Sequence, residues 1–367
     1  MINRTLRKGK CCFLTMTVVI LLFVGFNLCQ AADAPKTREL KWALFLAENA
    51  YQAPLIKKWR DSIEAYSNGA IKIKIYWVGQ MAETKDLPEL VRTGSIDMMS
   101  TGPNFNQSTY PLNSTLQGFA VLIKGTERSS FIGRNLRDFP DIQAEFAKNN
   151  EHCLTKATLA EYVLYTRKPF RTLEDFKGTR LRTMPGKYTS DWMKSLGAVN
   201  HDVPMADIYE SLMRRVLDGV VSNAQFVDSL KLYEIVKYSS YSFGNIVGWQ
   251  TSVNLNVWNS FTPEIKDAFI RASHEFNVAD LELNLTSEQK SIESLKKKGV
   301  QYIKIDDEAQ RAFIAKGGDP WKGARDAMVD TLKVDPAVAD RFLKRWRELD
   351  DEYEKTYVRT GKKWEYK

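Results

Sequence analysis

The sequence predicts an α/β protein that folds into two lobes. Three observations support this fold class. Segments with strand and helix periodicity alternate along the chain, the 367 residues exceed the usual size of a single hydrophobic core, and no low-complexity linker separates the halves. Lobes without a linker usually exchange segments, so the chain crosses between them more than once. Such crossings suit a hinge.

The first lobe is expected to alternate strands and helices. Strands are predicted at Glu39–Ala47, Ala70–Val78 and Ser95–Ser100, and helices at Ala53–Ser67 and Leu87–Thr93. The second of these strands alternates strictly between apolar and polar residues, which is typical of a strand with one face in water. The alternation of strand and helix predicts a largely parallel sheet.

The second lobe repeats this pattern. Strands are predicted at Thr158–Thr166, Arg180–Met184 and Val220–Ala224, with a helix at Ile208–Leu217 before the last of them. The run Pro263–Lys298 follows and predicts one very long helix. A helix of that length can brace both lobes and bend as they close.

These elements divide the chain into three parts. We predict a signal peptide at residues 1–31, a discontinuous first lobe at residues 33–157 plus 249–288, and a second lobe at residues 158–248 plus 289–367. A strand at Val247–Val257 is expected to return the chain to the first lobe. The tail from Asp319 onward is expected to be helical and to pack across the outside of both lobes.

The N-terminus indicates export. A basic segment at residues 4–10 precedes the apolar run Cys11–Leu28, and small residues around Ala31 follow as a cleavage region. An uncleaved membrane anchor is the alternative, because the apolar run approaches the length that spans a bilayer. A lipoprotein modified at Cys29 fits less well, since a polar and then a large residue precede this cysteine. We expect a cleaved signal peptide and a periplasmic protein.

Charge and cysteine content exclude several classes of protein. Without the four basic residues of the leader, 53 − 4 = 49 basic residues face 45 acidic ones, a net charge of +4. The two signs are interleaved, so nucleic acid is not an expected partner. Only Cys153 remains after cleavage, which allows no internal disulfide and no cysteine cluster for a metal. We expect Cys153 to be buried and structural, and we expect no cofactor or metal.

Catalytic patterns are scarce. The chain has three histidines and lacks the H-E-x-x-H, G-x-S-x-G and glycine-rich phosphate-loop motifs. A secreted hydrolase that uses the carboxylates of Glu48 and Asp97 is the remaining catalytic alternative. Asp97 is more simply a strand residue, so we expect a protein that is not an enzyme.

Polar residues follow the carboxyl ends of the predicted strands, where ligands bind in α/β sheets. The candidates at these strand ends are Glu48, Asn49, Tyr51, Gln80, Thr101 and Asn104 in the first lobe, and Arg182 and Met184 in the second. A guanidinium on a rigid strand can hold a carboxylate through two parallel hydrogen bonds. The sequence therefore predicts a carboxylate-binding site.

Five short motifs occur in order between Leu40 and Phe276. They are SNGAIKIKIYWVGQM at Ser67–Met81, RTGSIDMMSTGP at Arg92–Pro103, LEDFKGTRLRT at Leu173–Thr183, YESLMRRVLDG at Tyr209–Gly219 and VNLNVWNSF at Val253–Phe261. Each motif alone is weak. In this order they resemble the dicarboxylate-binding type of solute-binding protein from tripartite ATP-independent periplasmic (TRAP) transporters.

This resemblance implies a two-lobed periplasmic binding protein fold with a hinge, segment-swapped lobes and a long bracing helix. It implies a protein without a cofactor that captures a small organic acid by lobe closure and delivers it to the TRAP membrane permease. The sequence leaves the oligomeric state open, and we expect a monomer. In the family pattern the arginine that grips the ligand falls on Arg182, and Arg180 takes the outward-facing position. A ligand-binding sensor protein for a membrane receptor is the alternative.

Departures from the family pattern bear on the ligand. Tyr162 stands where many members have a second arginine, which weakens the case for a sialic-acid-like ligand. The asparagine contact of the family maps to either Ser222 or Asn223. This segment has no acidic residue, which argues against a cation that bridges the ligand carboxylate to the protein. Trp249, where the chain re-enters the first lobe, could stack on a ligand or belong to the core. Dicarboxylates, hydroxy or keto acids, sugar acids and aromatic acids all fit this pattern.

Overall fold

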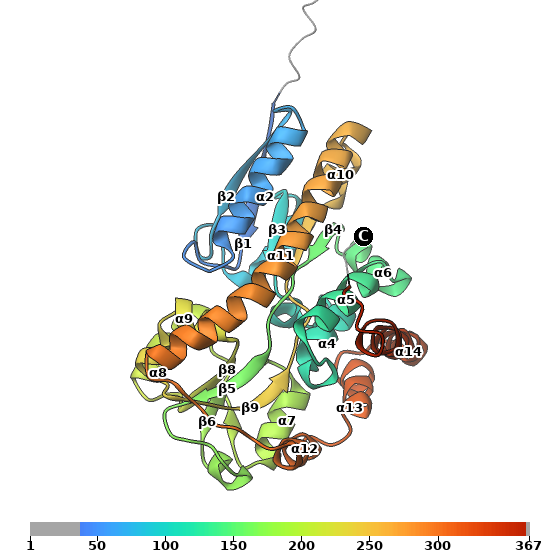
Figure 1. Cartoon of the computed structure of the whole chain (residues 1–367). Coiled ribbons are helices and arrows are strands. Elements are labelled where there is room, and N and C mark those ends of the chain that lie inside the picture. The colour runs from blue at the N-terminus through green and yellow to red at the C-terminus, as the bar shows by residue number, and fades with distance from the viewer. Residues whose placement is uncertain (1–36, 365–367) are drawn as a thin grey trace, which may run out of the picture. The chain divides into compact units, whose positions relative to one another are not determined.

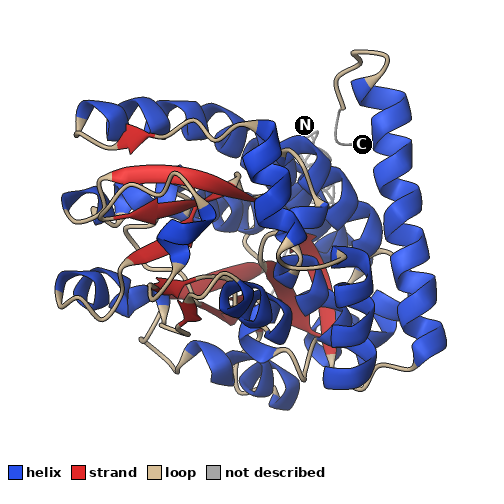
Figure 2. Cartoon of the chain, turned by 90° about the horizontal axis from the view of Figure 1, so that it is seen from below, coloured by secondary structure: helices blue, strands red, loops and turns tan. Residues whose placement is uncertain are grey.

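The computed structural model describes residues 37–364, and the predicted signal peptide lies outside them. From Glu39 onward the described residues form one compact unit. This unit contains two separate β-sheets with helices packed around them (Figure 1, Figure 2). The predicted α/β fold class is confirmed, whereas the residue bounds of the two lobes stay a prediction. No helix within residues 37–364 has the length and apolar character needed to cross a membrane.

The first sheet has five strands in the order β2-β1-β3-β10-β4. They are β1 (Arg38–Leu44), β2 (Ile71–Tyr76), β3 (Met98–Thr101), β4 (Glu151–Lys156) and β10 (Gln250–Asn254). β1 and β3 are parallel, but β10 runs antiparallel to both of its neighbours, β3 and β4. Because β10 is antiparallel to both, β4 runs in the same direction as β1 and β3. The prediction of a largely parallel sheet therefore holds for these three strands, and β10 is the exception. β10 arrives from the other sheet through a short connection, and an antiparallel strand needs no crossover helix.

The second sheet has six strands in the order β11-β9-β5-β8-β6-β7. They are β5 (Tyr162–Thr166), β6 (Arg180–Arg182), β7 (Val199–Asn200), β8 (Gly219–Ser222), β9 (Tyr238–Gly244) and β11 (Gln301–Tyr302). β6 is parallel to both β7 and β8, while β5 is antiparallel to β8 and β9. This sheet is also mixed, and the strand β6 that carries Arg182 lies between two parallel neighbours.

The helices pack around both sheets (Figure 2). They are α2 (Ala53–Tyr66), α3 (Leu87–Thr93), α4 (Pro111–Gly118), α5 (Thr126–Arg137), α6 (Pro140–Lys148), α7 (Lys187–Ser195), α8 (Ile208–Met213), α9 (Ala224–Ser229), α10 (Leu255–Asn259), α11 (Pro263–Lys297), α12 (Asp307–Ala315), α13 (Pro320–Asp326) and α14 (Pro336–Tyr353). The predicted long helix is α11, which begins after a cap in which the Thr262 side chain accepts a hydrogen bond from the Ile265 backbone N–H. α11 packs against α2 beside the first sheet and against α9 beside the second (Figure 1). It therefore braces both halves.

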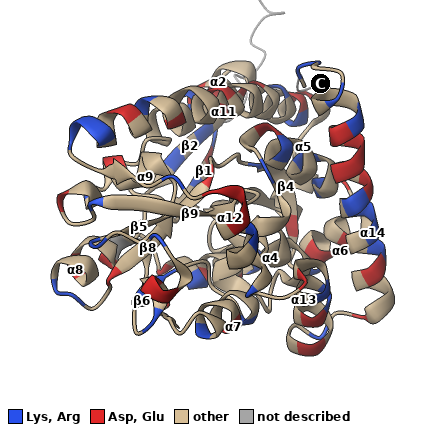
Figure 3. Ribbon diagram, turned by 60° about the horizontal axis from the view of Figure 1, so that its bottom comes forward, with Lys and Arg blue, Asp and Glu red and all other residues tan. Residues whose placement is uncertain are grey.

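The C-terminal helix α14 is amphipathic. Its buried side chains include Phe342 and Trp346, and the helix packs against α5. Acidic and basic residues both occur along the helix (Figure 3). This distribution is typical of a helix that covers a core with one face and is solvated on the other.

Two neighbouring chain segments connect the first sheet to the second. Residues 157–161 connect β4 to β5, and residues 245–249 connect β9 to β10. The Ala157 backbone N–H donates to the Trp249 carbonyl at 2.8 Å, and the Gly248 N–H donates to the Ala157 carbonyl at 2.9 Å. A Cβ atom on Gly248 would lie 2.3 Å from the Ala157 oxygen, so glycine permits this approach.

Gly248→Ala is expected to lower the free energy of unfolding by about 1–3 kcal/mol, because the crossing backbones must separate to admit the methyl group. Gly118→Ala is the control, since a Cβ there meets nothing within 4 Å and the residue ends a helix. Urea denaturation measures both variants. Equal stability of the two would contradict a tight contact between the crossing segments.

A buried polar cluster lies beside β4. The Tyr110 hydroxyl donates to Glu151, and the Lys156 ammonium donates to Asn113 and, at 3.2 Å, to Gln250. The Leu112 backbone N–H donates to Glu145 at 2.8 Å. Burial raises the pKa of Glu151 to about 8. Burial also raises the pKa of Glu145 and lowers that of Lys156.

The raised pKa of Glu151 predicts a pH-dependent stability. Between its ordinary pKa of 4.5 and about 8, only the unfolded chain ionises this carboxyl, so stability falls as the pH rises through that window. Glu151→Gln should reduce the decline between pH 5 and pH 8 by on the order of 1–3 kcal/mol, because the amide cannot ionise. Chemical denaturation across pH measures this, with the exposed Glu352→Gln as control. A decline of the same size in both variants would contradict the prediction.

Candidate functional site

A cavity of about 40 Å³ is lined by residues from both sheets and from the crossing segments. Five of the predicted site residues line it: Asn104, Tyr162, Arg182, Met184 and Trp249. The other lining residues are Phe45, Gly102, Phe105, Gln117, Leu159, Pro185, Met205, Phe226 and Ile246. Phe45 follows β1, Gly102 follows β3 and Met184 follows β6. The strand-end rule therefore led to this cavity in both halves of the chain.

Arg182 ends β6 and lies in this cavity. Only 8% of the residue is exposed, and its Nε donates to the Val203 carbonyl at 3.3 Å. Within the described part of the chain, no acidic side chain forms an ion pair with it. Burial lowers the pKa of the guanidinium, and the neighbouring Tyr162 and Asp202 partly oppose that shift. A buried guanidinium without a counter-ion is a ready partner for a carboxylate.

Arg180, two residues earlier on the same strand, has a different environment. Its guanidinium forms two hydrogen bonds with the Asp218 carboxylate, at 3.0 and 2.9 Å, and the side chain is 43% exposed. Positions i and i+2 share a face of a strand, so the two arginines differ by their place along β6. Arg180 begins the strand beside Asp218, and Arg182 ends it in the cavity.

The other polar groups of the cavity are few. The Gln117 side-chain oxygen accepts from the Asn104 backbone N–H at 3.0 Å, which holds the two residues together. Tyr162, the first residue of β5, is buried, and that burial raises its pKa to about 12. The Tyr162 hydroxyl is therefore a neutral hydrogen-bonding group next to Arg182.

Aromatic side chains form much of the remaining wall. Phe45 packs against Trp249 with ring centroids 5.9 Å apart and against Phe105 at 5.8 Å. Trp249 is 2% exposed and belongs to the hydrophobic core as well as to the cavity wall. The expectation that Trp249 belongs to the core is confirmed, and its contact with a ligand stays a prediction.

Four predicted residues are buried or partly buried but do not line the cavity. The Tyr51 hydroxyl donates to Asn284 at 2.8 Å, and Thr101 pairs with Gln250 across β3 and β10. Ser222 ends β8. The Asn223 side-chain oxygen caps α9 by accepting from the Phe226 backbone N–H at 2.9 Å.

Glu48, Asn49 and Gln80 are exposed and lie outside the cavity. Glu48 forms an ion pair with Lys57 at 2.6 Å. The carboxylate pair considered for a hydrolase is not assembled, because Glu48 follows the end of β1 whereas Asp97 precedes the parallel strand β3. The two residues therefore belong to opposite ends of the sheet. Residues 37–364 also contain no group of three or more histidine, cysteine or acidic side chains that could hold a metal ion.

The family model for bacterial extracellular solute-binding proteins, family 7, matches residues 45–325. That match spans most of the chain, including the cavity and every strand listed above except β1. The chain belongs to this family. The resemblance to TRAP solute-binding proteins is thereby confirmed, and the two-lobed fold with it.

Relatives and solved structures agree with this family 7 assignment. The 2,3-diketo-L-gulonate-binding periplasmic protein YiaO of Escherichia coli is 22% identical over 288 residues, which cover 78% of this chain and 87% of YiaO. The C4-dicarboxylate-binding periplasmic protein DctP of Rhodobacter capsulatus is 22% identical and covers 71% of this chain and 79% of its own. A Bordetella pertussis receptor that binds pyroglutamic acid superposes with a TM-score of 0.75 at 16% identity, over 85% of this chain and 100% of its own.

The sequence did not reveal the apolar lining residues of this family 7 protein. Leu159 and Ile246 lie on the crossing segments. Met205 precedes α8, and Phe226 lies in the first turn of α9. Apolar residues at such positions have the same pattern as core residues. Gln117 lies on α4, a helix that was not predicted, and only the structure shows that this polar side chain is buried.

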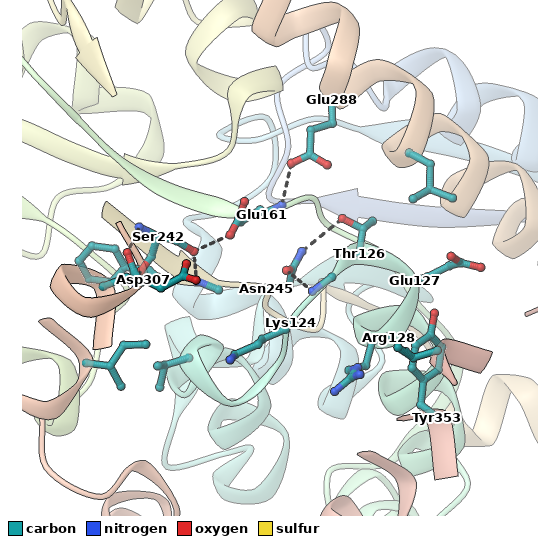
Figure 4. A pocket seen from close by; sticks show the side chains of 18 of the residues that line it. Lys124, Thr126, Glu127, Arg128, Glu161, Ser242, Asn245, Glu288, Asp307 and Tyr353 are labelled. Atoms are coloured by element: carbon teal, nitrogen blue, oxygen red, sulfur yellow. Dashed lines mark hydrogen bonds between the residues drawn. The ribbon is translucent and has the colours of Figure 1, made fainter. Parts of the chain in front are cut away.

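The protein has a second and larger groove, of about 840 Å³, at the ends of α5, β9 and α12 (Figure 4). Some of its polar groups pair with one another. The Glu161 backbone N–H donates to Glu288 at 3.2 Å, and the Gly125 N–H donates to Asn245 at 2.8 Å. None of the predicted site residues lines this groove. We therefore place the candidate ligand site in the smaller cavity at Arg182.

Arg182→Met is expected to leave the stability of the ligand-free protein unchanged or to raise it by up to about 1–3 kcal/mol, because a buried guanidinium without a counter-ion costs desolvation. Arg180→Met should lower stability by up to about 1 kcal/mol, since it breaks a partly exposed ion pair. Urea denaturation compares the two variants. A marked loss of stability in Arg182→Met would mean that the guanidinium supports the fold instead.

Proposed function

We propose that this protein binds a small organic acid in the cavity at Arg182 and delivers it to the membrane permease of a TRAP transporter. The observation that carries the proposal is the buried guanidinium at the end of β6, which has no acidic partner within the described residues. Relatives are named for binding 2,3-diketo-L-gulonate and C4-dicarboxylates, and similar structures hold galacturonate, pyroglutamate or orotic acid. All of these ligands are acids or their anions.

The positions of the lining residues support capture by closure. Arg182 comes from the second sheet, while Asn104 and Gln117 come from the other half of the chain. A ligand whose carboxylate lies on Arg182 would contact both halves at once. Binding energy from both sides favours the closed arrangement over the open one.

We further propose that the leader at residues 1–31 is cleaved, that the mature protein is a periplasmic monomer and that it carries out no catalysis. The family consists of extracellular solute-binding proteins, which supports an extracytoplasmic location. The separation of Glu48 from Asp97 at opposite ends of the first sheet supports a binding role without hydrolysis.

Arg182→Met should weaken binding of the physiological acid by about thirtyfold or more, since an unpaired buried carboxylate costs roughly 2–5 kcal/mol. A thermal-shift screen of small carboxylates identifies the acid, and isothermal titration calorimetry measures its affinity. Arg180→Met is the matched control on the same strand and should bind as the unaltered protein does. Unchanged affinity in Arg182→Met, or no acid bound from a broad panel, would refute the proposed function.

A further inference from the structure

The chemistry of the cavity wall restricts the ligand beyond the class of organic acids. Polar side chains line the cavity at four positions, Asn104, Gln117, Tyr162 and Arg182. The rest of the lining consists of apolar or aromatic side chains together with glycine and proline. A ligand enclosed here would therefore bury most of its surface against carbon atoms.

Arg182 is the only charged residue among those that line the cavity. One guanidinium can pair with one carboxylate through two parallel hydrogen bonds. A second carboxylate on the same ligand would be buried without a cation, which is strongly unfavourable. The charge of the wall therefore favours a monocarboxylate over a dicarboxylate.

The hydrogen-bonding capacity of the wall is also small. The Gln117 oxygen already accepts from the Asn104 backbone, and the Arg182 Nε already donates to Val203. What remains for the body of a ligand is the Asn104 side chain, the Gln117 amide nitrogen, the Tyr162 hydroxyl and the Trp249 indole N–H. A six-carbon sugar acid carries several hydroxyl groups, each with a donor and acceptors to satisfy, and a buried hydroxyl without a partner weakens binding.

The cavity is small. About 40 Å³ holds roughly three water molecules, so the two halves must separate for an acid of either kind to enter. We propose that the ligand is a small monocarboxylate with an unhydroxylated hydrocarbon body, either aliphatic or aromatic. This inference rests on the proposed function and distinguishes the protein from receptors solved with galacturonate or L-gulonate.

Two matched pairs of acids test the proposal by isothermal titration calorimetry with the purified protein. Hexanoate and gluconate share a six-carbon chain and one carboxylate but differ in hydroxylation. Butyrate and succinate share a four-carbon chain but differ in the second carboxylate. Hexanoate should bind at least tenfold more tightly than gluconate, and butyrate at least tenfold more tightly than succinate.

The outcomes separate this inference from the proposed function. The inference would be overturned if gluconate bound as tightly as hexanoate, or succinate as tightly as butyrate. If that binding were lost in Arg182→Met, the proposed function as an organic-acid receptor would still stand. Binding of no acid among these four would also overturn it. Only failure of a broad carboxylate panel, or binding that does not depend on Arg182, would overturn the receptor function as well.

A substitution in the wall provides an independent test. Met205→Gln introduces an amide of nearly equal size into the lining, whereas Met213→Gln makes the same change at a residue that is 51% exposed. Met205→Gln should weaken hexanoate binding at least fivefold and reduce the preference for hexanoate over gluconate. Met213→Gln should change neither. An unchanged preference in a folded Met205→Gln protein, as judged by circular dichroism, would contradict an apolar wall around the ligand.

Discussion

The paired crossing of the chain between its two sheets is the constraint on which the cavity depends. Ala157 and Gly248 lie so close that their backbones hydrogen-bond and leave no room for a side chain on the glycine. Leu159, Ile246 and Trp249 lie on the same two crossings and line the cavity. The segments that connect the sheets thus also form the floor of the site, so a change in the angle between the sheets must change the shape of the cavity.

The same crossing explains which parts of the fold could be predicted. Local periodicity and capping were sufficient to predict α11. Its observed end at Lys297 differs by one residue from the predicted end. The direction of β10 could not be obtained in this way. β10 is antiparallel to β3 because it enters from the other sheet, and that depends on which distant segment lies beside it. β9 was missed because Ser239 occupies a buried position of the strand and hides its alternation.

The candidate site was predictable where chemistry and strand ends coincide. Arg182 was chosen over Arg180 because the family pattern and the strand-end rule both indicated it, and it ends β6 in the cavity. Glu48 also follows a strand end, yet a neighbouring lysine in α2 pairs with it at the surface. Phe226 and Met205 carry no such signal, since an apolar side chain in a cavity wall and one in a core have the same composition. The sequence therefore indicated the charge of the site better than the nature of its walls.

Burial of Arg182 links ligand binding to the closure of the two halves. Under the proposed function, closure without a ligand encloses the guanidinium between aromatic and aliphatic walls and removes its water without supplying a counter-ion. Closure around a carboxylate encloses a charge-assisted pair instead. The side chain of Arg182 is buried, with 8% of the residue exposed, and its Nε donates to the Val203 carbonyl. A single arginine placed in this way both recognises the acid and penalises an empty closed state, which is what a receptor needs if only its loaded form is to engage a permease.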